Sequence, residues 1–418
     1  MGKDSFFSVR MYEKNRKWEN AIKRQHSLYS RDPEIRSEFA RDYNRILHCT
    51  AFRRLKHKTQ VFFATKNDHI CTRIEHVNHV VAVSYTIANF LGLNTELTNA
   101  IALGHDLGHA PFGHAGEEVL EEITKDKLSA KFWHERNSLR FADQIEILPD
   151  QNDVFQNLLL TYAVRDGILL HCGEDRGNTI YPREQAIDLA TIQEKGLFTP
   201  FTWEGCVVKI SDRIAYIGRD IEDAVRLDIL RKQQLKELKA IVNDIVGKKE
   251  KIREISNTAL MHGFIIDLCR ASSPENGIRF TEKYSKVMTS LTEYNYRNIY
   301  SSERLQAYKK YAKLVIELVF EVLMRAYAQR DSYESIKKSL KVYPILQRNF
   351  LAWIKGRSDL RSWPMSYPKF RSLGNKYNNE ILYVLADKGS YTQSVIDFIA
   401  GMTDNFAIEI FNEITSFR

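Results

Sequence analysis

Residues 102–109 read ALGHDLGH and place His105 and Asp106 side by side. A matching histidine, His76, lies 29 positions before His105, and a matching aspartate, Asp212, lies in the later segment VKISDRIAY. Each part falls on its own helical pattern of apolar residues, so folding can bring the four side chains together. Two imidazoles and two carboxylates form a mixed nitrogen and oxygen donor set that suits a divalent cation. The ordered quartet is specific, whereas a lone His-Asp pair would mean little.

The donor set contains no thiolate that would force zinc, so the predicted cofactor is a divalent ion among Mn, Mg, Fe, Co, Ni and Zn. Four protein ligands on a potentially octahedral ion leave positions for water and for a substrate oxygen. Such an ion can lower the pKa of water and neutralise charge on a phosphate. Taken alone, His76 would be a packed core histidine, and only the ordered set favours metal binding.

The composition is that of a globular helical protein. The chain has 418 residues, of which 44% are hydrophobic and 27% charged, with only nine prolines and 19 glycines. Its abundance of Leu, Ile, Lys, Glu and Arg favours helices over strands. We therefore expect an all-α fold, organised as one domain over residues 1–418 with peripheral helices.

Cysteine usage and hydropathy predict a cytoplasmic protein. The five cysteines are scattered and form no CxxC pair, which is typical of reduced thiols in the cytosol. The N-terminus has no apolar signal region, and no apolar run approaches the roughly 18 residues of a membrane span. We expect no contact with a membrane.

The net charge of +8 and the pI near 9.0 suit a polyanionic partner. Nucleic acid and a small polyphosphate are both compatible with this charge, and composition does not choose between them. The basic residues are dispersed rather than gathered in a tail, which favours a solvated surface over a dedicated binding groove.

Apolar periodicity predicts a series of helices. One spans 76–91 and stops at Gly92, and Thr95 looks like the N-cap of a helix that carries His105 and Asp106. Breaks near 111–113 precede a new helix that starts near residue 114. Further helices are expected at 154–171, 203–230, 233–270, 283–296, 302–330 and 392–416, with a loop at 173–185.

The 203–230 helix has two distinct faces. Its apolar positions (Val207, Ile210, Ile214, Ile217, Ile221 and Ala224) alternate by three and four and form a core stripe. Asp212, Tyr216 and Asp220 follow at i, i+4 and i+8, so they share the opposite face. That face is either solvated or the wall of a polar cavity, and the rest of the quartet favours the cavity.

Ionisable residues crowd the segment after Asp106. His105 and His109 are expected at i, i+4 on one helix face, and His114 and Glu117 stand at i, i+3 at a helix start. A carboxylate in that place can hold an imidazole in one tautomer and raise its basicity. The alternative is that Glu117 is a first-turn charge and His114 a cap. His134 follows a tryptophan and is either catalytic or merely packed.

Several of these stretches resemble the HD-domain deoxynucleoside triphosphate triphosphohydrolases, the dGTPase family. The similar blocks are AFRRLKHKTQV at 51–61, RIEH at 73–76, GHDLGHAPFGHAGE at 104–117, His134-Glu135, VRDGIL at 164–169, Glu204-Gly205, DRIAY at 212–216 and DFIAGMTD at 397–404. The match covers about residues 35 to 410, and the 104–117 block is its most specific part.

The resemblance implies an all-α HD-domain helical bundle with peripheral helices, its HD core at about 70–225 and a C-terminal helical part at about 226–418. It implies hydrolysis of a dNTP to a deoxynucleoside and intact triphosphate, with cleavage between the α-phosphorus and the 5′ oxygen. Control of the dNTP pool would be its role, and dGTP is the candidate preferred substrate. Residues 231–290, which would frame the base, match least, so the base preference stays open.

Site residues carry over from the resemblance position by position. The metal ligands carry onto His76, His105, Asp106 and Asp212, and the catalytic positions onto His114 with Glu117, His109 and His134. The substrate positions carry onto Gln60 and Asp220 near the sugar 3′-hydroxyl, Arg73 and Arg213 on the phosphates, Tyr216 near sugar or phosphate, Tyr300 against the sugar where a 2′-hydroxyl would fit, and Arg297 toward the phosphates. Positions 213, 218 and 219 carry Arg, Gly and Arg, where family members often carry other residues.

Partners and rival functions complete the prediction. The resemblance implies a homo-oligomer (a tetramer or hexamer) and leaves room for an allosteric dNTP and for single-stranded DNA. One rival is another HD-type nucleotide phosphohydrolase, such as a nucleoside monophosphatase or a cyclic-nucleotide or alarmone hydrolase. The other is a nucleic-acid-binding regulator on the same fold, whose signature would be a DNA affinity that falls steeply with salt.

Overall fold

The computed structural model describes residues 5–29, 32–62, 67, 69–173, 179–247, 253–362 and 376–416. These residues are mainly helical, and their strands form two short antiparallel pairs. One pair joins β1 (Ile147–Pro149) to β2 (Phe155–Asn157), and the other joins β3 (Thr179–Ile180) to β4 (Ile278–Arg279). The all-α prediction is confirmed. No helix in the described part of the chain is both long and apolar enough to cross a membrane.

The helices follow one another along the chain, with a long connection between α8 (Tyr162–Leu170) and α9 (Trp203–Arg226). Up to residue 226 they are α1 (Trp18–Ala21), α2 (Glu38–His48), α3 (Thr50–Arg54), η1 (Leu55–His57), α4 (Arg73–Leu91), α5 (Thr95–Gly104), α6 (His114–Leu128), α7 (His134–Arg140), η2 (Phe141–Ile145), α8 (Tyr162–Leu170), η3 (Leu189–Thr191) and α9 (Trp203–Arg226). Beyond it they are α10 (Lys232–Val246), α11 (Asn257–Ala271), α12 (Glu282–Asn295), η5 (Tyr296–Tyr300), α13 (Glu303–Arg325), η6 (Gln329–Asp331), α14 (Ser332–Ser339), α15 (Pro344–Lys355), η7 (Asp359–Ser362), α17 (Lys388–Ala400) and α18 (Asp404–Thr415).

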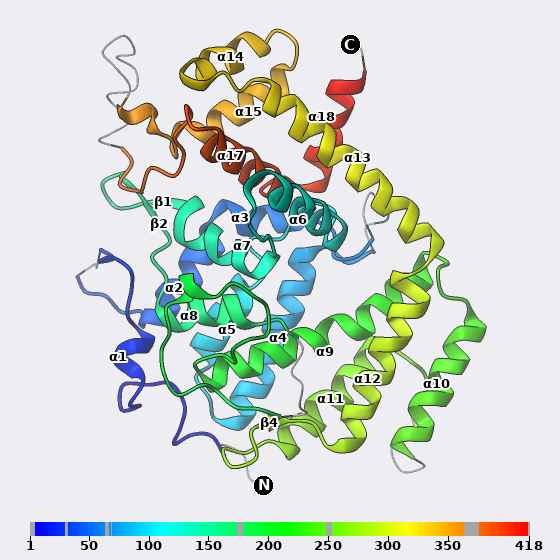
Figure 1. Cartoon of the computed structure of the whole chain (residues 1–418). Coiled ribbons are helices and arrows are strands. Elements are labelled where there is room, and N and C mark those ends of the chain that lie inside the picture. Colours follow the sequence, from blue (N-terminus) through cyan, green and yellow to red (C-terminus); the bar gives the residue numbers. More distant parts are fainter. Residues whose placement is uncertain are drawn as a thin grey trace.

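Helix α9 lies at the centre of the arrangement and packs against α4, α5, α8 and α11. Figure 1 shows α10, α11 and α12 gathered at one end of the molecule and α14, α15, α17 and α18 at the other, with the long α13 running between them. The described helices thus surround a core of α4, α5, α8 and α9, while the division of the chain into domains stays a prediction.

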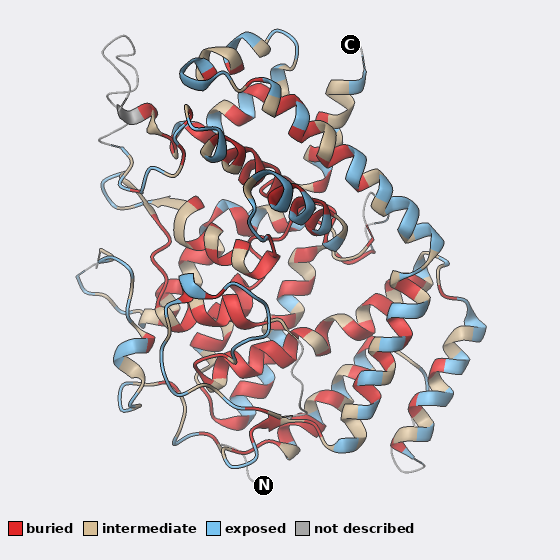
Figure 2. Ribbon diagram, viewed as in Figure 1, coloured by how far each residue is buried: buried red, intermediate tan, exposed pale blue. Residues whose placement is uncertain are grey.

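The apolar stripe of α9 is buried throughout, as its spacing predicts. Its six members join a cluster with residues of α4, α10, α11 and α12, and a second large cluster contains residues of α2, α5, α8, α13, α15 and α17. Figure 2 shows that burial is concentrated in the central helices. All five cysteines are free thiols, and four of them are buried.

Helix boundaries near the quartet correct the predicted N-cap of α5 and the predicted place of His105 and Asp106. Helix α4 ends where expected, at Gly92, whose φ of 79° only glycine adopts without strain. Helix α5 is capped by Asn94 rather than Thr95 and ends at Gly104. Residues 105–108 form a turn beyond that end. The prediction that His105 and Asp106 lie on the helix, and that residues 105 and 109 share a helix face, is therefore wrong.

Three longer helical predictions also differ from the structure. The expected helix at 154–171 is β2 followed by α8 alone, because Leu159 has a positive φ of 49° that interrupts the helix. The expected 233–270 helix is α10 and α11, and α10 stops at Gly247 with a φ of 77°. The expected 392–416 helix is α17 and α18, since the Thr403 side chain accepts the Phe406 N–H and caps a new start.

Asp404, at the end of the 397–404 block, binds the backbone on both sides of the turn that carries His105 and Asp106. The Asp404 carboxylate accepts the Thr59 N–H at 3.0 Å and the Phe112 N–H at 2.9 Å. The buried Lys58 ammonium donates to the carbonyl oxygens of His109 and Ala400, the latter at 2.9 Å. Buried backbone groups need such partners, so residues far apart in sequence fix one another.

Glycines let α5 and α8 approach closely. A Cβ at Gly104 would lie 2.7 Å from Ile168 Cδ1, and a Cβ at Gly167 would lie 2.6 Å from side-chain atoms of Ile101. Both contacts are closer than real Cβ atoms allow. The two helices therefore end side by side, which matters for the histidines that follow each of them.

Gly108 offers a test of how tightly the quartet's turn is packed. A Cβ there would lie 2.2 Å from the backbone of Asn137 and Ser138 in α7. The Ser138 hydroxyl also accepts the Gly108 N–H at 3.0 Å. We expect Gly108→Ala to lower the free energy of unfolding by roughly 1–3 kcal/mol, because the backbone cannot yield as a flexible side chain can. Urea unfolding followed by circular dichroism measures this. Gly389→Ala is the control, since its nearest contact is 3.3 Å; equal stability of the two variants would contradict the prediction.

Candidate active site

The four predicted metal ligands lie together in the structure. His76 comes from α4, His105 and Asp106 from the turn after α5, and Asp212 from α9, and all four are buried. His76 Nε2 lies 2.9 Å from Asp212 Oδ1. His105 Nε2 lies 3.5 Å from Asp106 Oδ2 and 3.9 Å from Asp212 Oδ1.

These donors have the spacing and chemistry that a divalent ion requires. With bonds of about 2.1 Å, neighbouring donors on an octahedral ion are about 3 Å apart and opposite donors about 4.2 Å apart. His105 Nδ1–H donates to the Ala102 carbonyl at 2.7 Å, which fixes the ring and leaves Nε2 as the bare nitrogen. That buried Nε2 has no hydrogen-bond partner within the described chain. The residues fit a metal ion.

Arg73 is paired with one of these carboxylates. Its Nη1 lies 2.5 Å from Asp106 Oδ2, and its Nε and Nη2 donate at 3.2 Å to the carbonyl oxygens of Thr59 and Gln60. Burial would raise the pKa of Asp106, but the Arg73 charge and neighbouring histidines hold it well below its usual range. The buried Gln60 Oε1 has no hydrogen-bond partner in the described residues.

Glu117 joins two predicted catalytic histidines. It lies in the first turn of α6, where its Oε2 accepts Nδ1–H groups from His114 and His134, each at 3.0 Å. Burial raises the Glu117 pKa, but the His134 charge and these hydrogen bonds outweigh burial and lower it. Burial likewise lowers the pKa of His134, but the carboxylates of Glu135 and Glu117 raise it to about 9. The cluster therefore holds a carboxylate and an imidazolium near neutral pH.

Ring contacts connect this cluster to the ligand quartet. The His109 ring stacks on His134 with centroids 4.6 Å apart and meets His114 edge-on at 5.1 Å. His171 lies 5.6 Å from His134 and 4.9 Å from His105. His109 itself is buried, with Nδ1 unpartnered among the described residues. The side chain of His114 is 67% exposed, so this buried row of imidazoles opens to solvent at one end.

A second polar group lies along α9 from Asp212. The Tyr300 hydroxyl donates to the buried Asp220 carboxylate at 2.5 Å. Burial raises the pKa of Asp220 to about 7, although the Tyr300 hydrogen bond acts in the other direction. Burial also raises the pKa of Tyr216. Arg213, on the same helix, is half-buried. The polar face of α9 is therefore largely withdrawn from solvent, which excludes the solvated alternative, while its role as a cavity wall stays a prediction.

Arg297 is the predicted residue that the structure does not bring to this group. It lies on η5, its side chain is 74% exposed, and it pairs with Glu293 at 3.2 Å. The other fourteen predicted residues lie near the quartet. Thirteen are on or beside α4, α6, α7, α9 and the turns that connect them, and Tyr300 contacts Asp220 of α9. Their assigned roles stay predictions.

Sequence reasoning missed two residues of the cluster. Lys195 Nζ lies 3.1 Å from Glu117 Oε1 and 3.7 Å from Glu135 Oε2, but it stands in a loop whose sequence carries no periodic signal. His171 lies in the same group of possible metal donors as His105 and Asp106. No sequence signal marked His171, because the expected 154–171 helix includes it and its neighbours come from other segments.

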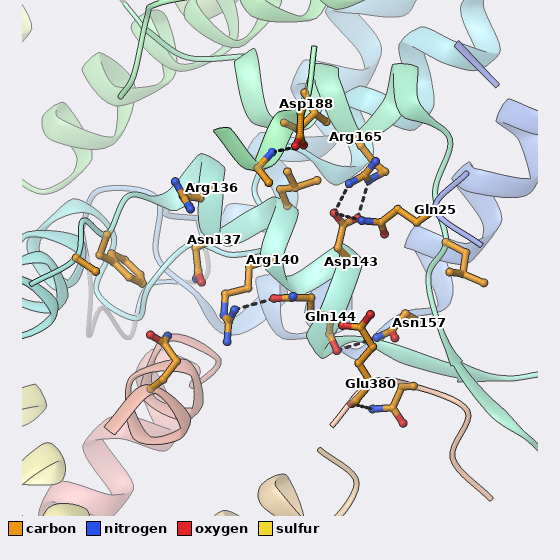
Figure 3. Close-up of a pocket in the computed structure, with 18 of the residues that line it drawn as sticks. Gln25, Arg136, Asn137, Arg140, Asp143, Gln144, Asn157, Arg165, Asp188 and Glu380 are labelled. Atoms are coloured by element: carbon orange, nitrogen blue, oxygen red, sulfur yellow. Dashed lines mark hydrogen bonds and ion pairs between the residues drawn. The ribbon is translucent and has the colours of Figure 1, made fainter. Parts of the chain in front are cut away.

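A separate cavity of about 1120 Å³ opens on another face of α7, and none of the fifteen predicted residues lines it. Figure 3 shows Arg136, Asn137, Arg140, Asp143 and Arg165 around it. Its charges are largely paired within the protein, Arg165 with Asp143 at 2.6 Å and Arg140 with Asp397 at 2.7 Å. The chemistry-bearing side chains instead face the quartet.

Comparisons with known proteins agree with this geometry. The family model of the HD domain matches residues 73–217, which include the whole quartet. A deoxyguanosinetriphosphate triphosphohydrolase-like protein of Caldanaerobacter subterraneus is 32% identical over 382 residues, covering 91% of this chain and 86% of the relative. The chain belongs to the deoxyguanosinetriphosphate triphosphohydrolase-like family.

Two further members of that family extend the comparison. The Rickettsia bellii protein is 31% identical over 405 residues, covering 94% of this chain and 96% of its own length. The Desulfatibacillum aliphaticivorans protein is 36% identical over 294 residues, covering 69% of this chain and 74% of its own length. Both carry the same family name. The family and its HD domain support a hydrolase, with His and Asp groups able to hold a metal ion.

The raised pKa of His134 predicts a pH-dependent stability. Because the folded-state pKa of about 9 exceeds the ordinary value of 6.5, this stabilisation is complete below about pH 6.5 and is lost as pH rises through about 9. Between about pH 6.5 and 9, we expect the free energy of unfolding to fall less in His134→Gln than in the wild type. Urea unfolding at several pH values, with a chelator present, measures it. His48→Gln, at an exposed position, is the control, and parallel pH profiles of wild type and His134→Gln would refute the prediction.

Proposed function

We propose that the protein hydrolyses a 2′-deoxynucleoside triphosphate to a deoxynucleoside and intact inorganic triphosphate, cutting between the α-phosphorus and the 5′ oxygen, and so limits the dNTP pool. The observation that carries this proposal is the contact between a set of metal donors and a cluster of acid–base side chains. A donor set fit for a divalent cation meets a carboxylate–imidazole cluster at His171, whose ring centroid lies 4.9 Å from that of His105 and 5.6 Å from that of His134. Relatives named as triphosphohydrolase-like proteins support the same substrate class.

The cation is the proposed cofactor, with His76, His105, Asp106 and Asp212 as its ligands. When bound, such an ion supplies Lewis acidity toward a phosphate and charge neutralisation. The protein's own part is to hold the four donors in place, through the Nδ1–H of His105 on the Ala102 carbonyl and Arg73 on Asp106. Such supporting contacts fix the orientation of ligand side chains.

His114 is the proposed acid. A 5′-alkoxide is a poor leaving group, and a positioned proton donor contributes roughly 10²–10⁴-fold to such a step. The Nδ1–H of His114 is held by Glu117, so its Nε2 is the nitrogen that can present a proton to the 5′ oxygen. The lowered pKa of Glu117 keeps its carboxylate ionised, so it can hold the ring in this orientation.

Cationic groups around the cluster suit a triphosphate. His134 is held as an imidazolium and Lys195 as an ammonium beside Glu117, while Arg73 and Arg213 come from α4 and α9. We assign these side chains, with His109, to phosphate contacts. Fixed positive groups in a partly dehydrated site stabilise charge that develops on phosphate oxygens.

The sugar is assigned to the polar face of α9. Asp220 is two helical turns from Asp212, about 12 Å along the axis. Its carboxylate, with Gln60 and Tyr216, is the proposed partner of the 3′-hydroxyl. The Tyr300 ring, fixed by its hydrogen bond to Asp220, would lie where a ribose 2′-hydroxyl would need space. Rejection of ribonucleotides would then be steric.

A product assay tests the proposed function. The four dNTPs are incubated singly and as a mixture with Mn²⁺ or Mg²⁺, and products are separated by anion-exchange chromatography. We expect deoxynucleoside and triphosphate in equal amounts, with GTP hydrolysed far more slowly than dGTP. Faster turnover in the mixture than in the single reactions would support an effector dNTP.

Other outcomes of that assay point to the rivals. Orthophosphate or pyrophosphate would assign the site to another HD-type phosphohydrolase. Absence of hydrolysis, with DNA affinity that falls steeply with salt, would favour a nucleic-acid-binding regulator. Assembly as a tetramer or hexamer, single-stranded DNA binding and a cytoplasmic location stay part of the proposal.

Glu117 and His114 should act as one unit. We expect His114→Ala to lower kcat by roughly 10²–10⁴-fold with little change in dNTP affinity, since the metal and phosphate contacts remain. Glu117→Gln should cost less, because the amide can still orient the ring, and the double variant should be scarcely worse than His114→Ala. A double-mutant cycle on kcat, with dNTP dissociation constants measured by calorimetry, tests this. Additive losses, or losses of affinity alone, would reassign both residues to substrate binding or helix capping.

A further inference from the structure

His171 is a buried histidine for which the proposed mechanism has no role. It stands at the C-terminus of α8, its Nδ1–H donates to the Ile168 carbonyl at 2.7 Å, and only 1% of the residue is exposed. Its Nε2 has no hydrogen-bond partner among the residues that the structure describes. Buried polar atoms are nearly always satisfied, so a bare imidazole nitrogen in the interior calls for an explanation.

His171 repeats the arrangement of the ligand His105. Each follows the last residue of its helix, and each donates Nδ1–H to the carbonyl three residues earlier, at 2.7 Å in both cases. In both rings Nε2 is therefore the nitrogen with the free lone pair, and in both it is buried and unpartnered within the described residues. This is the tautomer and orientation that metal-binding histidines need.

The two rings face the same small space. The close contact of α5 and α8 at Gly104 and Gly167 brings the helix ends together, and the ring centroids of His105 and His171 are 4.9 Å apart. One ligand atom each from His105, Asp106 and His171 lie within 4.8 Å of one another. Opposite donors on an octahedral ion are about 4.2 Å apart, so this upper limit is compatible with all three atoms binding one ion.

We propose that His171 is a fifth protein donor to the cation whose other ligands are His76, His105, Asp106 and Asp212. The inference rests on the proposed function only in using the same cation cavity. It is independent of which nucleotide is cleaved.

A third imidazole changes which ion the site prefers. Three nitrogen and two carboxylate donors suit Mn²⁺, Fe²⁺, Co²⁺, Ni²⁺ or Zn²⁺, whereas Mg²⁺ prefers oxygen ligands and keeps several waters. Five protein donors leave one position on an octahedral ion for the substrate or its nucleophile. His171 would thus make the protein dependent on a transition metal.

Metal binding tests the proposal without reference to turnover. The full chain is stripped with a chelator and titrated with Co²⁺ and Mg²⁺, and the visible Co²⁺ absorption spectrum and the dissociation constants are recorded for wild type and His171→Ala. We expect His171→Ala to weaken Co²⁺ binding by at least about tenfold, to alter the Co²⁺ spectrum and to affect Mg²⁺ less. Free imidazole should restore the spectrum by filling the space left by the ring.

Matched variants separate the possible outcomes. His48→Ala removes an exposed histidine and should bind Co²⁺ as wild type does. His105→Ala removes a ligand of the proposed function itself; if it binds Co²⁺ normally, the proposed site fails. If His105→Ala loses Co²⁺ while His171→Ala keeps wild-type affinity and spectrum, only the present inference is overturned.

Thermal unfolding monitors the fold of each variant. Should His171→Ala not fold, His171→Gln keeps much of the volume and an amide for the Ile168 carbonyl but has no imidazole lone pair. Weakened Co²⁺ binding with a changed spectrum in folded His171→Gln supports the proposal. An unchanged spectrum and affinity in that variant overturns it.

Discussion

The two carboxylate oxygens of Asp404 accept one backbone N–H each, from Thr59 and from Phe112, and the rest of the candidate site depends on that pair of bonds. The site is built largely from turns between helices, and turns have no internal ladder of hydrogen bonds to fix them. Lys58 adds a second tie by donating to carbonyls of His109 and Ala400. Because a buried N–H or carbonyl without a partner is costly, displacement of the 397–404 segment would loosen two distant segments at once.

Charge is the second constraint on this interior. Carboxylates at positions 106, 117 and 212 are buried, and burial alone would raise their pKa values. The pKa of each is instead lowered by its neighbours: Arg73 beside Asp106, the hydrogen bond with His76 at Asp212, and the His134 charge with the His114 hydrogen bond at Glu117. Buried charges persist only in such pairs, so the side chains proposed for chemistry also compensate one another electrostatically.

Local patterns predicted much of the core. The stop at Gly92 and the buried stripe of α9 follow from helical periodicity and from a glycine that can adopt positive φ. The same periodicity failed where the helix ended early: apolar and small residues around His105 continue the pattern although the backbone has turned. Lys195 and His171 were missed because their partners come from other segments, and no spacing along one segment reveals such contacts. Arg297 was predicted through resemblance alone, and the fold leaves it paired with Glu293 on the surface.

The contact between α5 and α8 limits how this sequence can vary. Gly104 faces Ile168, and Gly167 faces Ile101, so each glycine is set against an isoleucine of the other helix. A larger residue at either glycine would press on the facing isoleucine, which would have to change rotamer or shorten for the helix ends to stay together. Each glycine is therefore expected to vary together with the isoleucine it faces, although neither glycine carries a functional group.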